Sequence, residues 1–212
     1  QDDFFKISLL QEKTEPLVNI NEAVKEKPYL EKIENFLVKE YSEDQLLLHT
    51  IKAETYFSYK DSPVILLEIV VKTYDKSQQE NLVLKSNRAK IMKSGEVIFN
   101  GEVNIVTKSG VLHQLDTEEL TLLTESNQIK SESEITYLGI NEKITSQGME
   151  MNQDSDTMYL NGEVKIKQDF GPIIKTTNLF VNHYDGNKIY QSKGRTVYSS
   201  EDNTVSSEQG ID

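Results

Sequence analysis

The sequence predicts an all-β protein, an antiparallel sheet of long strands preceded by a short N-terminal helix. Three observations predict this fold class. Apolar and polar residues alternate over most of the chain after residue 45. Residues that favour tight turns, such as Asp185-Gly186-Asn187, separate the alternating segments. Two nearly identical words, FNGEVNI at 99–105 and LNGEVKI at 160–166, indicate a repeated unit of about 60 residues.

The N-terminal part of the chain differs in pattern from the rest. Residues 1–28 have few patterned apolar positions, and we expect a loosely ordered arm there. From Pro28 the apolar side chains recur at the helical steps of three and four: Leu30, Ile33, Leu37 and Tyr41. A helix this short must pack against another element or become ordered with a partner. We therefore expect an arm and helix over 1–44 and one β domain over 45–212.

Alternation with a period of two defines the strands of the β domain. Around the first word, one phase is apolar: Val97, Phe99, Val103 and Ile105, with Gly101 in the same phase. Around the second word, the corresponding set is Met158, Leu160, Val164 and Ile166, with Gly162 in the same phase. A period of two with one polar face indicates a sheet that is wet on one side. The expected strands are 45–59, 63–75, 80–92, 96–108, 111–124, 127–137, 140–151, 157–168, 172–184, 187–199 and 203–211.

The repeated words have a structural explanation. A unit of roughly four strands cannot bury its apolar face alone, so stacked units share one core and one continuous sheet. Each unit then needs a small residue at the same corner. Glycine inside a strand marks a bulge, a bend or a close backbone approach, which fits Gly101 and Gly162.

Composition and charge exclude several classes of function. The net charge of −12 disfavours nucleic-acid phosphates and anionic lipid headgroups as electrostatic partners. The chain has no cysteine, which excludes disulfides and thiol chemistry. We find no apolar run long enough for a membrane span and no signal peptide, and Gln1 is a position that a removed signal or anchor can precede.

The sequence contains no arrangement typical of a catalytic or metal site. Its three histidines stand far apart, without the spacing of metal ligands. Asp154-Ser155-Asp156 fits a turn better than a calcium loop, because the remaining ligands of such a loop are missing. We therefore predict no enzyme activity, no metal and no cofactor. The apolar inner face is then the remaining candidate site, either as a plain core or as an open groove for an acyl chain.

Several segments, in order, resemble a known family. They are LLHTIKA at 47–53, LVLKSNRAKI, VIFNGEVNIVTKSGVLHQLDTEEL, NQIKSESEITY, INEKITSQGMEMNQD and MYLNGEVKI. Their order and spacing resemble the periplasmic lipopolysaccharide-export proteins, the LptC and OstA-like LptA group. The resemblance covers 45–170 and continues more weakly to 212. Its opening section favours an LptC-like protein, whereas the missing anchor and the extra C-terminal half-repeat favour an LptA-like one.

The resemblance implies an open, twisted β-jellyroll of OstA-like repeats with an interior that accommodates lipid. It implies a non-enzymatic periplasmic protein that stacks edge to edge with similar domains. Such a bridge passes lipopolysaccharide, or a similar glycolipid or lipoprotein, from an inner-membrane ABC transporter toward the outer membrane. Carried over by position, the lipid-facing candidates are Phe99, Val103, Ile105, Leu122, Ile135, Leu160, Val164 and Ile166.

The unpaired sheet edges leave an alternative open. Edge strands invite pairing with another chain, and we expect the edges at 45–59 and 203–211. A structural β-repeat protein that binds only other proteins, or further copies of itself head to tail, would use the same edges. Bound lipid in the purified protein would separate this alternative from a lipid carrier.

Overall fold

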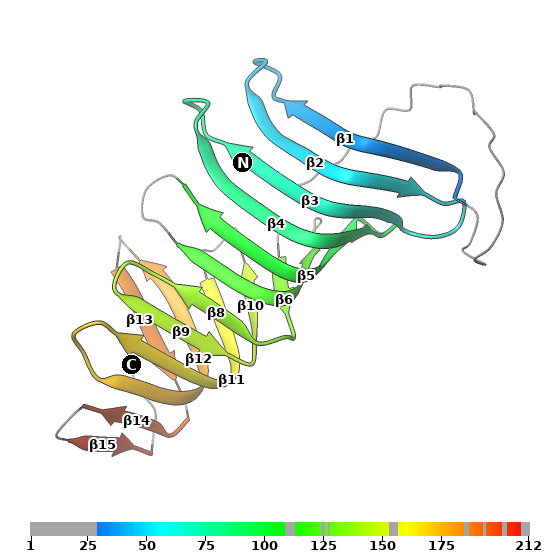
Figure 1. Cartoon of the computed structure of the whole chain (residues 1–212). Coiled ribbons are helices and arrows are strands. Elements are labelled where there is room, and N and C mark those ends of the chain that lie inside the picture. The colour runs from blue at the N-terminus through cyan, green and yellow to red at the C-terminus, as the bar shows by residue number, and fades with distance from the viewer. Residues whose placement is uncertain are drawn as a thin grey trace.

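The all-β prediction is confirmed by a computed structural model of the chain. It describes residues 29–108, 113–123, 126, 128–152, 157–184, 187–192, 194–200 and 203–208. In this part of the chain the strands form one antiparallel sheet of 15 strands. Figure 1 shows them following one another along the molecule, with β1 at one end and β14 and β15 at the other. No helix capable of crossing a membrane occurs among these residues.

The strands are from 4 to 12 residues long, and β11 and β12 are as long as β2, β4 and β5. Their bounds are β1 Glu31–Tyr41, β2 Leu47–Ser58, β3 Val64–Tyr74, β4 Glu80–Ile91, β5 Glu96–Thr107, β6 Gln114–Leu123, β7 Gln128–Ser131, β8 Ile135–Leu138, β9 Glu142–Ser146, β10 Gly148–Asn152, β11 Thr157–Gln168, β12 Ile173–Tyr184, β13 Asn187–Ser192, β14 Thr196–Ser199 and β15 Thr204–Ser207. The predicted strands 127–137, 140–151 and 187–199 are each interrupted and appear as two strands, β7–β8, β9–β10 and β13–β14.

These interruptions belong to a single feature, a line along which the whole sheet bends. At the same level of the sheet, strand pairing skips residues in β4, β5 and β11. Positive φ angles occur at this level at Asn35, Glu68, Gly101, Glu102, Gly162 and Asn178. Positive φ is uncommon outside glycine, so its recurrence from strand to strand marks a repeated distortion. We call this row the bend line.

The bend line divides the sheet into two walls. Wall A comprises 31–34, 55–58, 64–67, 88–91, 96–100, 121–123, β7, β10, 157–161, 179–184 and β13. Wall B comprises 36–41, 47–52, 69–74, 80–85, 103–107, 114–117, β8, β9, 163–168, 173–177, β14 and β15. Leu122 of wall A and Ile144 of wall B belong to one buried apolar cluster. The inner faces of the two walls therefore share a core.

Buried serine hydroxyl groups hydrogen-bond to backbone carbonyl oxygens along the bend line. Ser86 Oγ lies 2.8 Å from the carbonyl oxygen of Arg88 and 3.0 Å from that of Asn100, and its single O–H proton is shared between the two. Ser146 Oγ donates to the carbonyl oxygen of Gly148 at 2.9 Å. A buried carbonyl without a partner is costly, so these small polar side chains stabilise the bend without widening it.

The predicted helix over 28–41 is wrong, because Glu31–Tyr41 forms β1 and pairs with β2. The cause of the error is the positive φ of Asn35, which shifts the alternation by one residue. The helical steps of three and four therefore combined half-buried Ile33 with Leu37 and Tyr41, whose side chains are 55% and 53% exposed. The sheet thus begins before residue 45, and the predicted arm over 1–28 lies outside the described residues.

The predicted edges are corrected in part. The 45–59 strand is not an edge, because β2 pairs with β1 on one side and β3 on the other. Among the described residues, β1 takes that position at the N-terminal end of the sheet. At the C-terminal end, β15 pairs with β14 and ends the path of neighbouring strands. It is shorter than the predicted 203–211, of which 209–211 lie outside the described residues.

Candidate functional site

An apolar cavity of about 520 Å³ lies between the two walls, on the side away from the bend line. Its lining comes from the strand ends of both walls. Wall A contributes Ile129, Met149, Met151, Thr157, Met158, Val181 and Tyr190. Wall B and the segments beside it contribute Asn81, Leu82, Ile105, Thr107, His113, Gln114, Leu115, Tyr137 and Ile144. The volume lies within the range of about 300–1,000 Å³ that is usual for small-molecule sites.

Methionine is concentrated in this cavity. Three of the four methionines of the chain line it, Met149, Met151 and Met158. An unbranched thioether side chain changes conformation easily and fills irregular space. The wall A lining can therefore adapt to apolar ligands of different shape.

Polar side chains gather at the cavity and join its two walls. Tyr190 of β13, in wall A, donates a hydrogen bond to Glu142 Oε2 of β9, in wall B, at 2.7 Å. Burial raises the pKa of Tyr190, and the hydrogen bond to Glu142 raises it further. Tyr190 therefore stays a protonated donor at neutral pH. On wall B, the Tyr137 hydroxyl hydrogen-bonds to His113 Nδ1, and the two rings stack with centroids 5.5 Å apart.

The residues predicted from the sequence all lie on the inner face, but at different depths. Seven of them are at most 3% exposed and belong to the shared core: Phe99, Val103, Leu122, Ile135, Leu160, Val164 and Ile166. Ile105 is half-buried and lines the cavity. Their lipid-binding role stays a prediction. The position of the cavity makes residues near the strand ends the better candidates for contact with lipid.

Of the residues predicted from the sequence, Ile105 lines the cavity, and the rest of the lining was not predicted. Most of the predicted residues belong to the repeated words or lie beside them. These words lie at the bend line, whereas the cavity lies near the outer ends of the strands. One signal was present: Met149 and Met151 alternate with polar residues within the predicted strand 140–151. The contact between Tyr190 and Glu142 has no local signal, because it depends on the closure of the two walls.

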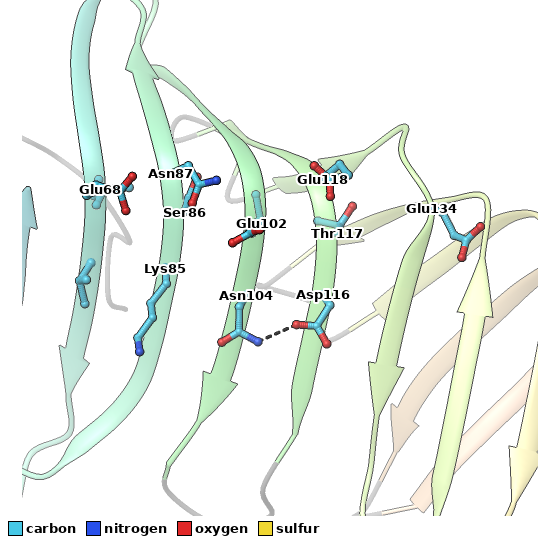
Figure 2. Close-up of a pocket in the computed structure, with 13 residues that line it drawn as sticks. Glu68, Lys85, Ser86, Asn87, Glu102, Asn104, Asp116, Thr117, Glu118 and Glu134 are labelled. Atoms are coloured by element: carbon cyan, nitrogen blue, oxygen red, sulfur yellow. Dashed lines mark hydrogen bonds between the residues drawn. The ribbon is translucent and has the colours of Figure 1, made fainter.

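A second, larger hollow of about 760 Å³ lies over the bend line among β3, β4, β5 and β6 (Figure 2). Glu68 of β3, Glu102 of β5 and Glu118 of β6 are exposed there. Asn104 Nδ2 donates to Asp116 Oδ1 at 2.6 Å within the same hollow. This carboxylate-rich lining is unsuited to acyl chains. Among the described residues, no group of three or more histidine, aspartate or glutamate side chains is placed to hold a metal ion.

Comparison with known protein families identifies the family of this chain. A family model described as "Lipopolysaccharide-assembly, LptC-related" matches residues 7–169. A comparison with curated protein sequences gave no match. Because the family model covers most of the chain, the protein belongs to the LptC-related lipopolysaccharide-assembly family, a non-enzymatic transport component of the cell envelope.

Proposed function

We propose that this protein acts in the periplasm as a lipid-binding bridge component. It holds acyl chains of lipopolysaccharide, or of a similar envelope lipid, between its walls. It passes the lipid from an inner-membrane ABC transporter toward the outer membrane. The observation that supports this proposal is the apolar cavity lined by both walls, with Ile105 on one side and Met158 on the other.

The energetics of acyl-chain burial suit a site of this kind. Each buried methylene contributes about 0.8 kcal/mol, so a chain of several methylenes is held without a dedicated polar group. The polar headgroup stays at the mouth or in solvent, where it keeps its hydration. Release of the lipid then breaks no covalent bond. It needs only a second apolar site of similar affinity on the next carrier.

The two ends of the sheet supply the bridging surfaces. An edge strand presents free N–H and C=O groups and pairs readily with a strand of another domain. Beside the N-terminal edge, Leu37 and Tyr41 of β1 are 55% and 53% exposed. Such apolar side chains favour burial under a neighbouring domain. Head-to-tail pairing through β1 and β15 is heterologous and extends the sheet into a continuous trough.

The test is a site-specific photo-crosslink from β5 to lipid. A photoreactive amino acid at Ile105 faces the cavity, whereas the same substitution at Ile98 lies in the opposite phase of the strand, on the outer face. We expect Ile105 to capture lipopolysaccharide in membrane-containing extracts and Ile98 to capture none. Equal capture from both positions, or capture from Ile98 alone, would contradict the cavity as the lipid site.

The exposed side chains of β1 also favour a second function, a structural protein that binds only other proteins. In that case Ile105 and Ile98 both fail to capture lipid, and no lipid co-purifies. A crosslinker at Leu37 then still captures a protein partner.

A further inference from the structure

The cavity is small for the lipid that the family transports. A volume of about 520 Å³ suits a ligand of drug size, such as one acyl chain. Lipopolysaccharide carries several acyl chains on one headgroup. If the protein takes up such a lipid, the two walls must move apart at their open side.

The walls are continuous at the bend line and held together at the cavity by the side chains of Tyr190 and Glu142. Tyr190 lies on β13, which pairs with β12 in wall A. Glu142 lies on β9, which pairs with β8 and β11 in wall B. The 2.7 Å hydrogen bond between them therefore spans the opening rather than joining neighbouring strands.

The surroundings favour a strong and persistent bond. The acceptor is a carboxylate, and hydrogen bonds to charged groups are stronger than those between neutral groups. Tyr190 packs against the apolar core, and Glu142 is half-buried, so water competes weakly for the bond. Opening the walls exposes both side chains to water and breaks the bond.

We infer that Tyr190 and Glu142 form a latch that controls separation of the walls and thereby the entry of lipids with more than one acyl chain. This inference rests on the proposed function. With the latch closed, the cavity admits a single acyl chain. With the latch open, the methionine-rich lining of wall A moves away from Ile105 and Ile144, and a lipid with several chains enters.

Wall separation is measured directly with spin labels. The chain has no cysteine, so introduced cysteines carry the labels alone. Lys143→Cys and Ile189→Cys place labels at exposed positions next to the two latch residues. In this background we expect Tyr190→Phe to give a longer and broader label–label distance than the parent. Tyr159→Phe, at a 39% exposed position on β11, makes the same chemical change away from the latch and leaves the distance unchanged.

Lipid uptake is measured with two probes, purified lipopolysaccharide and a fluorescent single-chain fatty acid. Tyr190→Phe is expected to raise the association rate constant for lipopolysaccharide on the order of tenfold. A factor of this size corresponds to the free energy of one hydrogen bond to a charged group. Tyr159→Phe, outside the cavity lining, leaves the binding of both probes at wild-type values. Glu142→Gln keeps an acceptor oxygen and gives an intermediate effect, and Glu142→Ala matches Tyr190→Phe.

The outcomes separate the latch from the proposed function. If folded Tyr190→Phe and Glu142→Ala leave both the label distance and lipopolysaccharide binding at wild-type values, the latch is refuted while lipid binding stands. If the wild-type protein binds neither probe, the proposed function fails, and the latch has no role in lipid entry. Far-UV circular dichroism checks that each variant is folded. Should Glu142→Ala unfold, Tyr190→Phe and Glu142→Gln decide the question.

Discussion

The hydroxyl oxygens of Thr117 and Ser131 lie 3.0 Å apart inside the bend line. One repeat later, the hydroxyl oxygens of Thr176 and Ser192 form the same pair at 2.5 Å. The first pair joins β6 to β7, and the second joins β12 to β13. In each case the first strand directly follows a repeated word, and the second strand belongs to wall A. The two words therefore recur because the chain builds the same bend twice, with the same glycine and the same buried hydroxyl pair.

Removing one hydroxyl of this pair should destabilise the fold. Thr117→Val keeps the shape of the side chain but removes the hydrogen bond with Ser131 and the contact of Thr117 Oγ1 with the carbonyl oxygen of Glu119, while Ser131 keeps its bonds with Ser133. We expect a loss of about 0.5–1.5 kcal/mol in the free energy of unfolding, the usual net contribution of one hydrogen bond. Thr121→Val, on the same strand at a half-buried position, should change it by less than about 0.5 kcal/mol. Urea denaturation measures both. Thr117→Val and Ser131→Ala together should cost less than the sum of the two single losses, because the bond between the two hydroxyls can be lost only once. A strictly additive loss would count against this pairing.

The two glycines of the repeated words should differ in their sensitivity to alanine. Both have positive φ, 78° at Gly101 and 72° at Gly162, which costs an L-residue about 1–2 kcal/mol. A Cβ at Gly162 would also meet Gln147 Oε1 and lie 2.8 Å from Gln147 Cδ, two atoms that alanine lacks, whereas the nearest atom to a Cβ at Gly101 would be Asn87 Nδ2 at 3.1 Å. We therefore expect Gly162→Ala to lower the free energy of unfolding more than Gly101→Ala. Adding Gln147→Ala should reduce that difference, and its failure to do so would show that contact with Gln147 is not the cause.

Alternation predicted most of the strands and the buried inner-face residues of the two repeated words, and the repeat predicted where glycine bends the sheet. The N-terminal strand was missed because the bend at Asn35 shifts the phase of alternation, so that its apolar residues imitate a helix. The cavity was not predicted because its lining depends on the distance between the two walls, which no local sequence pattern determines. The contact between Tyr190 and Glu142 joins strands distant in sequence, and no local pattern of residues encodes it.

The contribution of Tyr190 to the free energy of unfolding should decrease at alkaline pH. Folding raises the pKa of its hydroxyl, chiefly through burial and then through the bond to Glu142. For a group whose pKa is raised in the folded state, the contribution is present below the unfolded value, about 10 for tyrosine, and is lost as the pH rises above it. The difference in unfolding free energy between wild type and Tyr190→Phe should therefore shrink above about pH 10. Denaturation midpoints measured from neutral to alkaline pH check this, and a constant difference would contradict it.

Filling the cavity should reduce lipid uptake without unfolding the protein. Met151 is half-buried in the cavity lining, and Met151→Trp adds volume where space already exists. We expect binding of the single-chain fatty-acid probe to fall, while the thermal unfolding midpoint changes little. Met92→Trp, in the turn after β4, is the matched substitution outside the cavity. Unchanged binding in Met151→Trp would place the lipid elsewhere.

The C-terminal edge offers a substitution that separates pairing within the chain from pairing with a partner. The Ser200 N–H donates to the Asn203 carbonyl oxygen at 2.8 Å at the start of the β14–β15 hairpin. Hydrogen-bonded and non-hydrogen-bonded pairs alternate along an antiparallel ladder. The pair of Tyr198 with Val205 is then hydrogen-bonded, and the pair of Val197 with Ser206 is not. The N–H of Ser206 therefore points away from β14, toward the open edge.

Ser206→Pro removes that outward donor but leaves the bonds between β14 and β15 in place, and proline is tolerated on an edge strand. If β15 joins the next domain of the bridge, Ser206→Pro should abolish concentration-dependent association in sedimentation, and Ser206→Ala should retain it. Val205→Pro, which removes an inward donor, should instead disrupt the hairpin itself. A folded Ser206→Pro variant that associates like the wild type would show that β15 is not the interface, and the bridge would then have to be built through β1.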